Sequence, residues 1–243
     1  FSIKKEKPLL IYECHIGMAQ EREDVGTYIE FKDKILPRVK EGGYNCIQIM
    51  AIQEHPYYGS FGYHVSNFFA PSSRFGTPEE LKELIDTAHS MGIAVIMDIV
   101  HSHSVANELE GLGNLAGDKS QYFHSGNRRE HSAWGSLCFD YGKDAVLHFL
   151  LSNCKYWMDE YHFDGFRFDG VTSMIYYSHG LGESFCNYDD YFNGRQDGDA
   201  ICYLMLANKL IHECNPNAIT IAEEVSGMPG LAAPFEDGGY GFD

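Results

Sequence analysis

The chain has 243 residues, 44% of them hydrophobic and 22% charged, as in an ordinary globular protein with a sizeable core. Its formal net charge of −17 argues against nucleic acids and anionic membranes as partners, because phosphate binding needs clustered lysine and arginine. No apolar run approaches the ~20 residues of a membrane-spanning helix. The composition suits a neutral substrate such as a sugar polymer.

The seven cysteines are odd in number and include no C-x-x-C pair. Neither a disulfide framework nor a zinc knuckle is therefore expected. Reduced thiols of this kind predict a cytoplasmic protein.

The first part of the chain alternates apolar strands with a helical pattern. A strand is predicted at 9–16, followed by a helix at 31–43. Pro37 is expected to kink that helix. A second strand is predicted at 45–52.

The clearest helix is predicted at 77–92. Thr77 is a good N-cap, Pro78 occupies the first helical position, and Glu80 completes a capping box. Apolar residues follow from Leu81 at i, i+3, i+4 and i+7, which predicts one buried face.

The second part of the chain repeats the same alternation. Strands are predicted at 93–100, 163–170 and 218–225, and helices at 143–162 and 199–215. Two long insertions, at about 104–143 and 171–198, exceed plain connections and indicate functional loops. The final GGYGFD is compatible with the edge of a sixth strand.

Repeated βα units predict a parallel sheet covered by helices, either an open doubly wound sheet or a (β/α) barrel. Asp98, Asp169 and Glu223 each end a different predicted strand, and in a barrel those ends form the active-site face. No G-x-G-x-x-G follows the first strand, as a dinucleotide fold would require. We therefore predict an α/β fold, an incomplete (β/α)8 TIM-type barrel of about five strands and the start of a sixth, filling residues 1–243.

The segment GFRFDG carries an ionic pattern on one face of its strand. Because side chains alternate, Arg167 and Asp169 share one face, and Phe166 and Phe168 share the other. The aromatic face suits packing against helices, so the charged face is expected to point into the barrel. The arginine is expected to hold Asp169 ionised and to depress its pKa, as a nucleophile requires.

The segment ITIAEEV offers two glutamates, and only one can share the side of Asp169. Neighbouring strands lie ~4.8 Å apart, close to the ~5–5.5 Å between the carboxyls of retaining glycosidases. Carboxylates at the ends of neighbouring strands fit that geometry without strain. From the residues alone, a structural salt bridge at the barrel mouth stays an alternative interpretation.

The segment DIVHSH ends the third strand with Asp98, His101 and His103. An H-x-H after a barrel strand can hold a divalent metal, but such sites expect H-x-H on the first strand. We predict no metal and no cofactor here. Tyr63 and His64 lie in an aromatic, glycine-rich stretch (58–81) that can stack on sugars or simply pack within the loop.

Together these segments resemble the α-amylase superfamily of glycoside hydrolases. The resemblance implies substrate-binding roles for Asp98 and His103 in DIVHSH and for Arg167 in GFRFDGVTS. It implies that Asp169 is the nucleophile and that Glu223, in TIAEEVSGMP, is the general acid/base.

The remaining site residues also follow from this resemblance. FGYHVSNFFAPSSRFG resembles the stretch that places Tyr63 beneath the sugar being cleaved, with His64 beside it as a further binding residue. Amylases usually carry Asn where Ser102 stands, and Glu224 replaces the Asp expected after the acid/base.

Within the superfamily, the chain looks most like the eukaryotic-type glucan branching enzymes. LLIYECHIGMA, HPYYGSFGYHV, DIVHSHSV, HSAWGSLCFDYG and AEEVSGMP carry this likeness. It implies a retaining double displacement that cleaves α-1,4 links and forms α-1,6 branches, with an α-1,4-glucan (glycogen, amylose or amylopectin) as partner.

The superfamily has a third carboxylate after strand seven, and this sequence offers no residue for it. We therefore expect a fragment, a truncated product or one part of a larger chain, inactive alone. Two other functions stay open: an α-glucan hydrolase of the same superfamily, and a non-catalytic glucan-binding or vestigial protein.

Overall fold

The computed structural model describes residues 1–3 and 7–243. A five-stranded parallel sheet runs through its centre in the order β1-β2-β5-β6-β7. Its strands are β1 (Ile11–Cys14), β2 (Cys46–Ile49), β5 (Ala94–Ile99), β6 (Gly165–Phe168) and β7 (Ile219–Ala222). Each strand pairs with the preceding strand of the sheet, with no reversal of order. A doubly wound sheet reverses at a switch point, so the sequential order supports a barrel wall.

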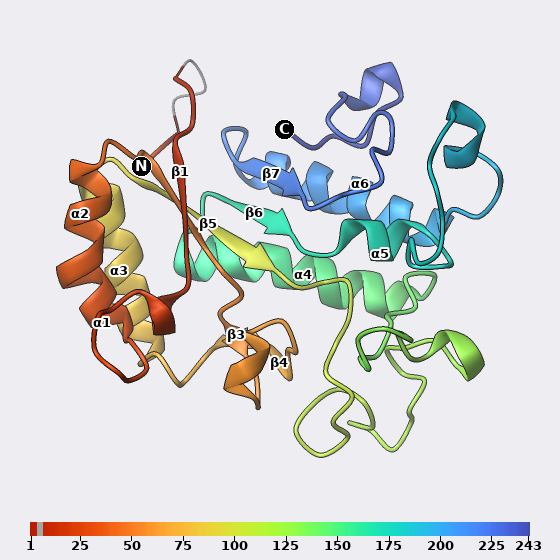
Figure 1. Cartoon of the computed structure of the whole chain (residues 1–243), viewed down its shortest axis with the longest axis horizontal. Helices are drawn as coiled ribbons and strands as arrows, with labels where there is room; N and C mark the ends of the chain where they lie inside the picture. Colours follow the sequence, from red (N-terminus) through yellow and green to blue (C-terminus); the bar gives the residue numbers. More distant parts are fainter. Residues whose placement is uncertain (4–6) are drawn as a thin grey trace.

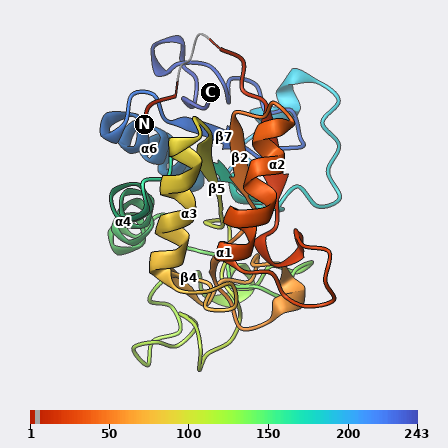
Figure 2. The same ribbon diagram turned by 90° about the vertical axis from the view of Figure 1, so that its left-hand side faces the viewer.

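Helices cover one side of this wall (Figure 1). Figure 2 shows α2, α3, α4 and α6 following one another around the outside of the sheet. The helices are α1 (Tyr28–Glu30), α2 (Leu36–Glu41), α3 (Pro78–Ser90), α4 (Asp144–Tyr161), α5 (Val171–Ile175) and α6 (Gly198–Cys214). The alternation of strand and helix confirms the predicted α/β architecture.

The helix predicted at 31–43 begins earlier than expected, at Tyr28. Thr27 caps it, and its hydroxyl accepts from the backbone N–H of Glu30, whose carboxylate accepts from the N–H of Thr27. A π-helical segment, Phe31–Ile35, then joins α1 to α2. Pro37 is the second residue of α2. The N–H that proline lacks therefore falls in the first turn of this helix, directly after the π-helical segment.

Helix α3 has the predicted capping box: the Thr77 hydroxyl accepts from the N–H of Glu80, and the Glu80 carboxylate accepts from the N–H of Thr77. Its predicted apolar face is buried. A second, two-stranded antiparallel sheet, β3 (Gln53–Glu54) and β4 (Asn67–Pro71), was not predicted.

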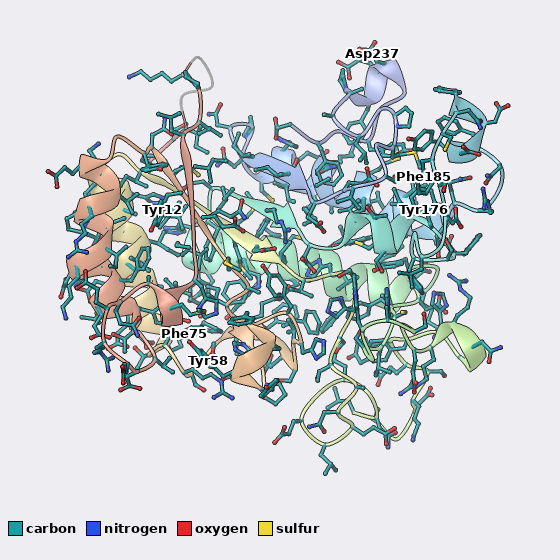
Figure 3. All side chains as sticks on the ribbon, viewed as in Figure 1. Tyr12, Tyr58, Phe75, Tyr176, Phe185 and Asp237 are labelled. Atoms are coloured by element: carbon teal, nitrogen blue, oxygen red, sulfur yellow. The ribbon has the colours of Figure 1, made fainter. Side chains whose placement is uncertain are left out.

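The aromatic side of β6 is packed as predicted, because Phe166 and Phe168 are fully buried. At the end of β1, a Cβ on Gly17 would lie 2.8 Å from both the Phe75 ring and the Tyr58 hydroxyl, so only glycine fits beneath these two rings, which lie together in Figure 3. Within the part of the chain that the structure describes, all seven cysteines are free, and no helix has the length and apolar character of a membrane span.

The two predicted insertions lie beyond the carboxyl ends of the strands. The loop after β5, green in Figure 1, is held by isolated bridges between Ser104 and Leu137 and between Phe123 and Phe139. The segment 171–198 is not wholly irregular, since it begins with α5. At the chain's end, the backbone N–H of Asp243 donates to the carbonyl of Thr220 (2.9 Å), next to β7, with no strand assigned there.

Candidate active site

The register of the sheet brings the predicted acidic residues to one edge. Asp98 on β5 lies directly opposite Arg167 on β6, and Arg167 lies opposite Ile221 on β7. Just beyond the strands, the Asp169 N–H donates to the carbonyl of Ile99 (3.1 Å), and the Glu223 N–H donates to that of Phe168 (2.9 Å). The ladder therefore continues to the two carboxylates and fixes their relative positions.

Arg167 links the acidic side chains of this edge. Its Nη1 donates to both Asp98 oxygens (2.8 and 2.9 Å) and to Asp169 Oδ1 (2.8 Å). Its Nη2 lies 4.0 Å from Glu223 Oε2. The Tyr63 hydroxyl donates to Asp98 Oδ2 (2.8 Å). Asp98, fully buried, is therefore neutralised by the arginine and held by a phenol.

The pKa of Asp169 departs from the expectation drawn from the sequence. Burial raises the pKa of Asp169, and burial likewise raises the pKa of Asp98; the Arg167 guanidinium opposes both rises without reversing them. The predicted depression of the Asp169 pKa is therefore wrong, because desolvation of a nearly enclosed carboxyl outweighs one shared guanidinium.

His103 is buried and held in one tautomer. Its Nε2–H donates to the carbonyl of Tyr63 (2.6 Å), since a carbonyl only accepts, and its Nδ1 then accepts from the Ser102 hydroxyl (2.8 Å). Burial lowers the pKa of His103 to about 3, so the ring is neutral at physiological pH. The ring of His64 meets it edge-on, with centroids 5.9 Å apart.

The two adjacent glutamates diverge as strand alternation requires. Glu223 Oε2 accepts from the N–H of Gly170 (2.9 Å), the residue after Asp169. Glu224 instead accepts from the Thr172 hydroxyl (2.8 Å) and from backbone N–H groups of 226–228. These hydrogen bonds, set against a partial burial that raises it, leave the pKa of Glu224 below its usual value. Glu224 therefore anchors the loop, and Glu223 faces the site.

A cavity of about 430 Å³ lies over this edge. It is lined by Tyr63, His64, His103, Trp134, Asp169, Gly170 and Glu223. Asp98 and Arg167 lie behind this lining, in contact with it. All seven sequence-predicted site residues are thus brought together.

Sequence reasoning missed two lining residues, Trp134 and Gly170. Trp134 comes from the loop after β5, and a tryptophan in a long loop after a barrel strand was the available signal. Gly170 has φ +65°, and a Cβ there would lie 3.0 Å from Ser102 Oγ and 3.3 Å from Trp134 Cη2. Only glycine fits beneath the indole at this point.

The H-x-H of the third strand does not converge on one point. His101 is fully buried, and its Nε2–H donates to Asn153 Oδ1 (2.9 Å) while the Tyr203 hydroxyl donates to its Nδ1. His103 instead reaches the cavity wall. Across residues 1–3 and 7–243, no group of three or more His, Cys, Asp or Glu side chains is arranged to hold a metal ion.

Comparison with known proteins identifies the class of protein to which this strand wall and its acidic carboxyl edge belong. The family model "Alpha amylase, catalytic domain" matches residues 22–240. The chain therefore belongs to the α-amylase catalytic-domain family.

Within that family, the chain is homologous to 1,4-alpha-glucan-branching enzymes. It is 59% identical to the enzyme of Dictyostelium discoideum over 239 residues, covering 98% of this chain and 35% of the relative. It is 58% identical to branching enzyme 2-2, chloroplastic/amyloplastic, of Arabidopsis thaliana over 241 residues (99% and 30%). The chain thus spans about a third of the length of these curated relatives.

Solved structures give the same fold. An α-amylase from Geobacillus thermoleovorans, complexed with acarbose, superposes with a TM-score of 0.72 at 19% identity, over 96% of this chain and 50% of that one. A putative alpha amylase from Salmonella typhimurium gives 0.65 at 27% identity, over 88% and 31%.

Proposed function

We propose that this chain forms part of the catalytic barrel of an α-1,4-glucan branching transglycosylase. The observation that carries the proposal is the placement of Asp169 and Glu223 in one cavity, joined through the Gly170 N–H and flanked by Arg167. Identity above 50% to proteins named as branching enzymes supports this chemistry over other reactions of the family.

In the first step, an oxygen of Asp169 attacks the anomeric carbon of an α-1,4-linked glucose. The bond to the leaving O4 breaks, and Glu223 supplies the proton that this oxygen needs. Because Glu223 Oε2 accepts from a backbone N–H, the proton is carried on Oε1. Arg167 favours the ionised form of Asp169 that attack requires, although burial raises its pKa.

In the second step, the glucosyl–Asp169 ester is opened by the 6-hydroxyl of an acceptor chain. Glu223, now ionised, takes the hydroxyl proton, and Asp169 leaves as a carboxylate. An α-1,6 branch results, and both residues return to their starting protonation states. Water in place of the acceptor would give hydrolysis, which is the second candidate.

We assign substrate binding to the other residues of the cavity. Tyr63 and Trp134 offer aromatic faces on which sugar rings stack, while His64 and Arg167 offer groups for hydroxyls. Asp98 and His103, whose polar atoms already bind protein groups, contribute by holding Tyr63 in place. The expected polymer is glycogen, amylose or amylopectin.

We further propose a cytoplasmic location. Seven free thiols support a reducing compartment. The plastid named for the Arabidopsis relative is the competing location. Fractionation of cells with an antibody to this chain distinguishes the two.

The test of function is a branching assay on the full-length gene product. Amylose is incubated with the protein, and iodine colour and reducing ends are followed before and after enzymatic debranching. We expect colour to fall and debranchable ends to appear, and Asp169→Asn to abolish both. Asp159→Asn, the same change at an exposed salt bridge on α4, is the matched control and keeps full activity.

Three other results would contradict the proposal. New reducing ends without debranchable ends would show a hydrolase. Glucan binding without turnover would show a non-catalytic protein. Equal activity in Asp169→Asn would place the chemistry elsewhere.

A further inference from the structure

Four rings form a column that leads away from the cavity. The ring of His103 lies 5.0 Å from that of Trp134, at an interplanar angle of 59°. Trp134 also stacks flat on His131, with centroids 4.0 Å apart and planes 4° from parallel. His131 in turn lies 4.3 Å from His179. The indole thus has His131 flat against one face, whereas His103 meets it at a tilt.

His131 is itself fixed on all sides. It is only 2% exposed, and its Nδ1 accepts from the N–H groups of Ala133 (3.3 Å) and Trp134 (3.2 Å). Its Nε2–H therefore donates to the Ser173 hydroxyl (3.0 Å) on α5. These bonds connect the loop after β5 with the helix that follows the Asp169 strand.

Trp134 and His103 are the members of the column that line the cavity, and Trp134 is the more exposed of the two. It is 40% exposed, and its Cη2 lies against Gly170, beside Asp169. The chain's other tryptophan, Trp157, is fully buried, and its indole N–H donates to the carbonyl of Phe68 (3.1 Å). Of these two tryptophans only Trp134 is open to a water-borne quencher, and in a longer gene product its signal is the part of the quenching that Trp134→Ala removes.

We propose that His131 is a positioning residue that holds the Trp134 indole as a preformed wall for a glucose ring. This inference rests on the proposed glucan site and adds to it a residue outside the cavity. An indole on a loop has conformational freedom, which it loses when a ligand binds. A flat partner against one face removes that freedom in advance, and the exposed part of the ring is left to line the cavity.

The effect belongs to binding rather than to bond cleavage, because His131 does not touch the cavity. An aromatic stack of this kind predicts a rise in KM of about three- to tenfold when it is lost, with kcat nearly unchanged. A residue that merely maintained the fold would change kcat and thermal stability as well.

The test uses His131→Asn in the full-length gene product. An asparagine Oδ1 can take the place of Nδ1 as acceptor for the Ala133 and Trp134 N–H groups, so the turn is kept while the ring is removed. His148→Asn, the same substitution at an exposed position of α4, is the matched control. Circular dichroism melting shows that each variant is folded.

We expect acrylamide to quench His131→Asn more strongly than wild type, KM for amylose to rise, and kcat to remain within about threefold. The His148→Asn control stays at wild-type values. Trp134→Ala should raise KM at least as much, and adding His131→Asn to it should raise KM no further, because the two act through one wall.

An unchanged KM and unchanged quenching in His131→Asn would overturn the inference, as would a KM unaffected by Trp134→Ala. Failure of the proposed function is separately visible: wild type would then make no branches. In that case, maltoheptaose binding followed by Trp134 fluorescence decides the inference, which requires weaker binding by His131→Asn than by wild type.

Discussion

Removal of Arg167 tests the electrostatic account of the site. Asp98 is fully buried, and its two oxygens accept from Arg167 Nη1, with one further hydrogen bond from Tyr63. Arg167→Met leaves this carboxylate with the phenol alone. Breaking a buried ion pair from one side costs about 3–5 kcal/mol of unfolding free energy.

Protonation of the stranded carboxyl limits that loss. Holding Asp98 neutral costs about 1.4 kcal/mol for each pH unit above its unfolded pKa of about 3.9, or about 4 kcal/mol at pH 7. Its folded pKa, already raised by burial, rises further without the arginine. The folded state then holds a proton that the unfolded state has lost, so the stability of the variant falls as pH rises from about 4 through neutrality.

Urea unfolding followed by circular dichroism at pH 5 and pH 7 measures both effects. Asp98→Asn in the Arg167→Met background removes the stranded charge and should recover about 2 kcal/mol at pH 7. A loss below about 1 kcal/mol in Arg167→Met, or a double variant no more stable than the single one, would show that Asp98 does not depend on the arginine for its charge balance.

Three further predictions follow from the surrounding contacts. Gly62 has φ +93°, and a Cβ at this position would lie 1.7 Å from the carbonyl oxygen of Ala51. Gly62→Ala should therefore lower the unfolding free energy by about 3 kcal/mol or more and displace the Tyr63 loop. A urea midpoint equal to that of wild type would contradict this. The pKa of His103 is lowered to about 3, so the ring stays neutral in the folded state but protonates near pH 6.5 in the unfolded state. The stability that it contributes is therefore lost as pH falls below about 6.5, and His103→Gln should flatten the dependence of unfolding free energy on pH. Equal slopes of unfolding free energy against pH in variant and wild type would count against this. Glu224→Gln replaces a carboxylate that accepts from several N–H groups and should lower the unfolding free energy by about 1–3 kcal/mol in urea unfolding. A variant as stable as wild type would show that the loop after β7 does not depend on this carboxylate.

Local patterns predicted those parts of the fold that local physics controls. Alternation in GFRFDG placed Phe166 in the core and Arg167 at the site, because strand pleating alone decides the face. The capping box of α3 was recognised, whereas the same Thr-x-x-Glu pattern at Thr27 and Glu30 was overlooked. The π-helical turn before Pro37 depends on packing that periodicity does not encode.

The candidate site was predictable where motifs lie at strand ends and not where loops fold back. Asp98, Asp169 and Glu223 converge because parallel strands end at one edge. Trp134 reaches the same cavity only through the path of the loop at residues 100–143, which depends on long-range contacts. The Asp169 pKa was predicted in the wrong direction, because the sequence names the arginine but not the depth of burial.

We propose that Asp169 and Glu223 act as a retaining pair, with Asp169 as nucleophile. The most direct measurement treats the full-length gene product with a 5-fluoro-α-glucosyl fluoride, which forms the glycosyl ester quickly and releases it slowly, and then locates the label by peptide mass spectrometry. We expect one glucosyl adduct, on Asp169, that is released faster when a maltooligosaccharide acceptor is added. Label on Glu223 or Asp98, or no label on enzyme that still branches amylose, would contradict it.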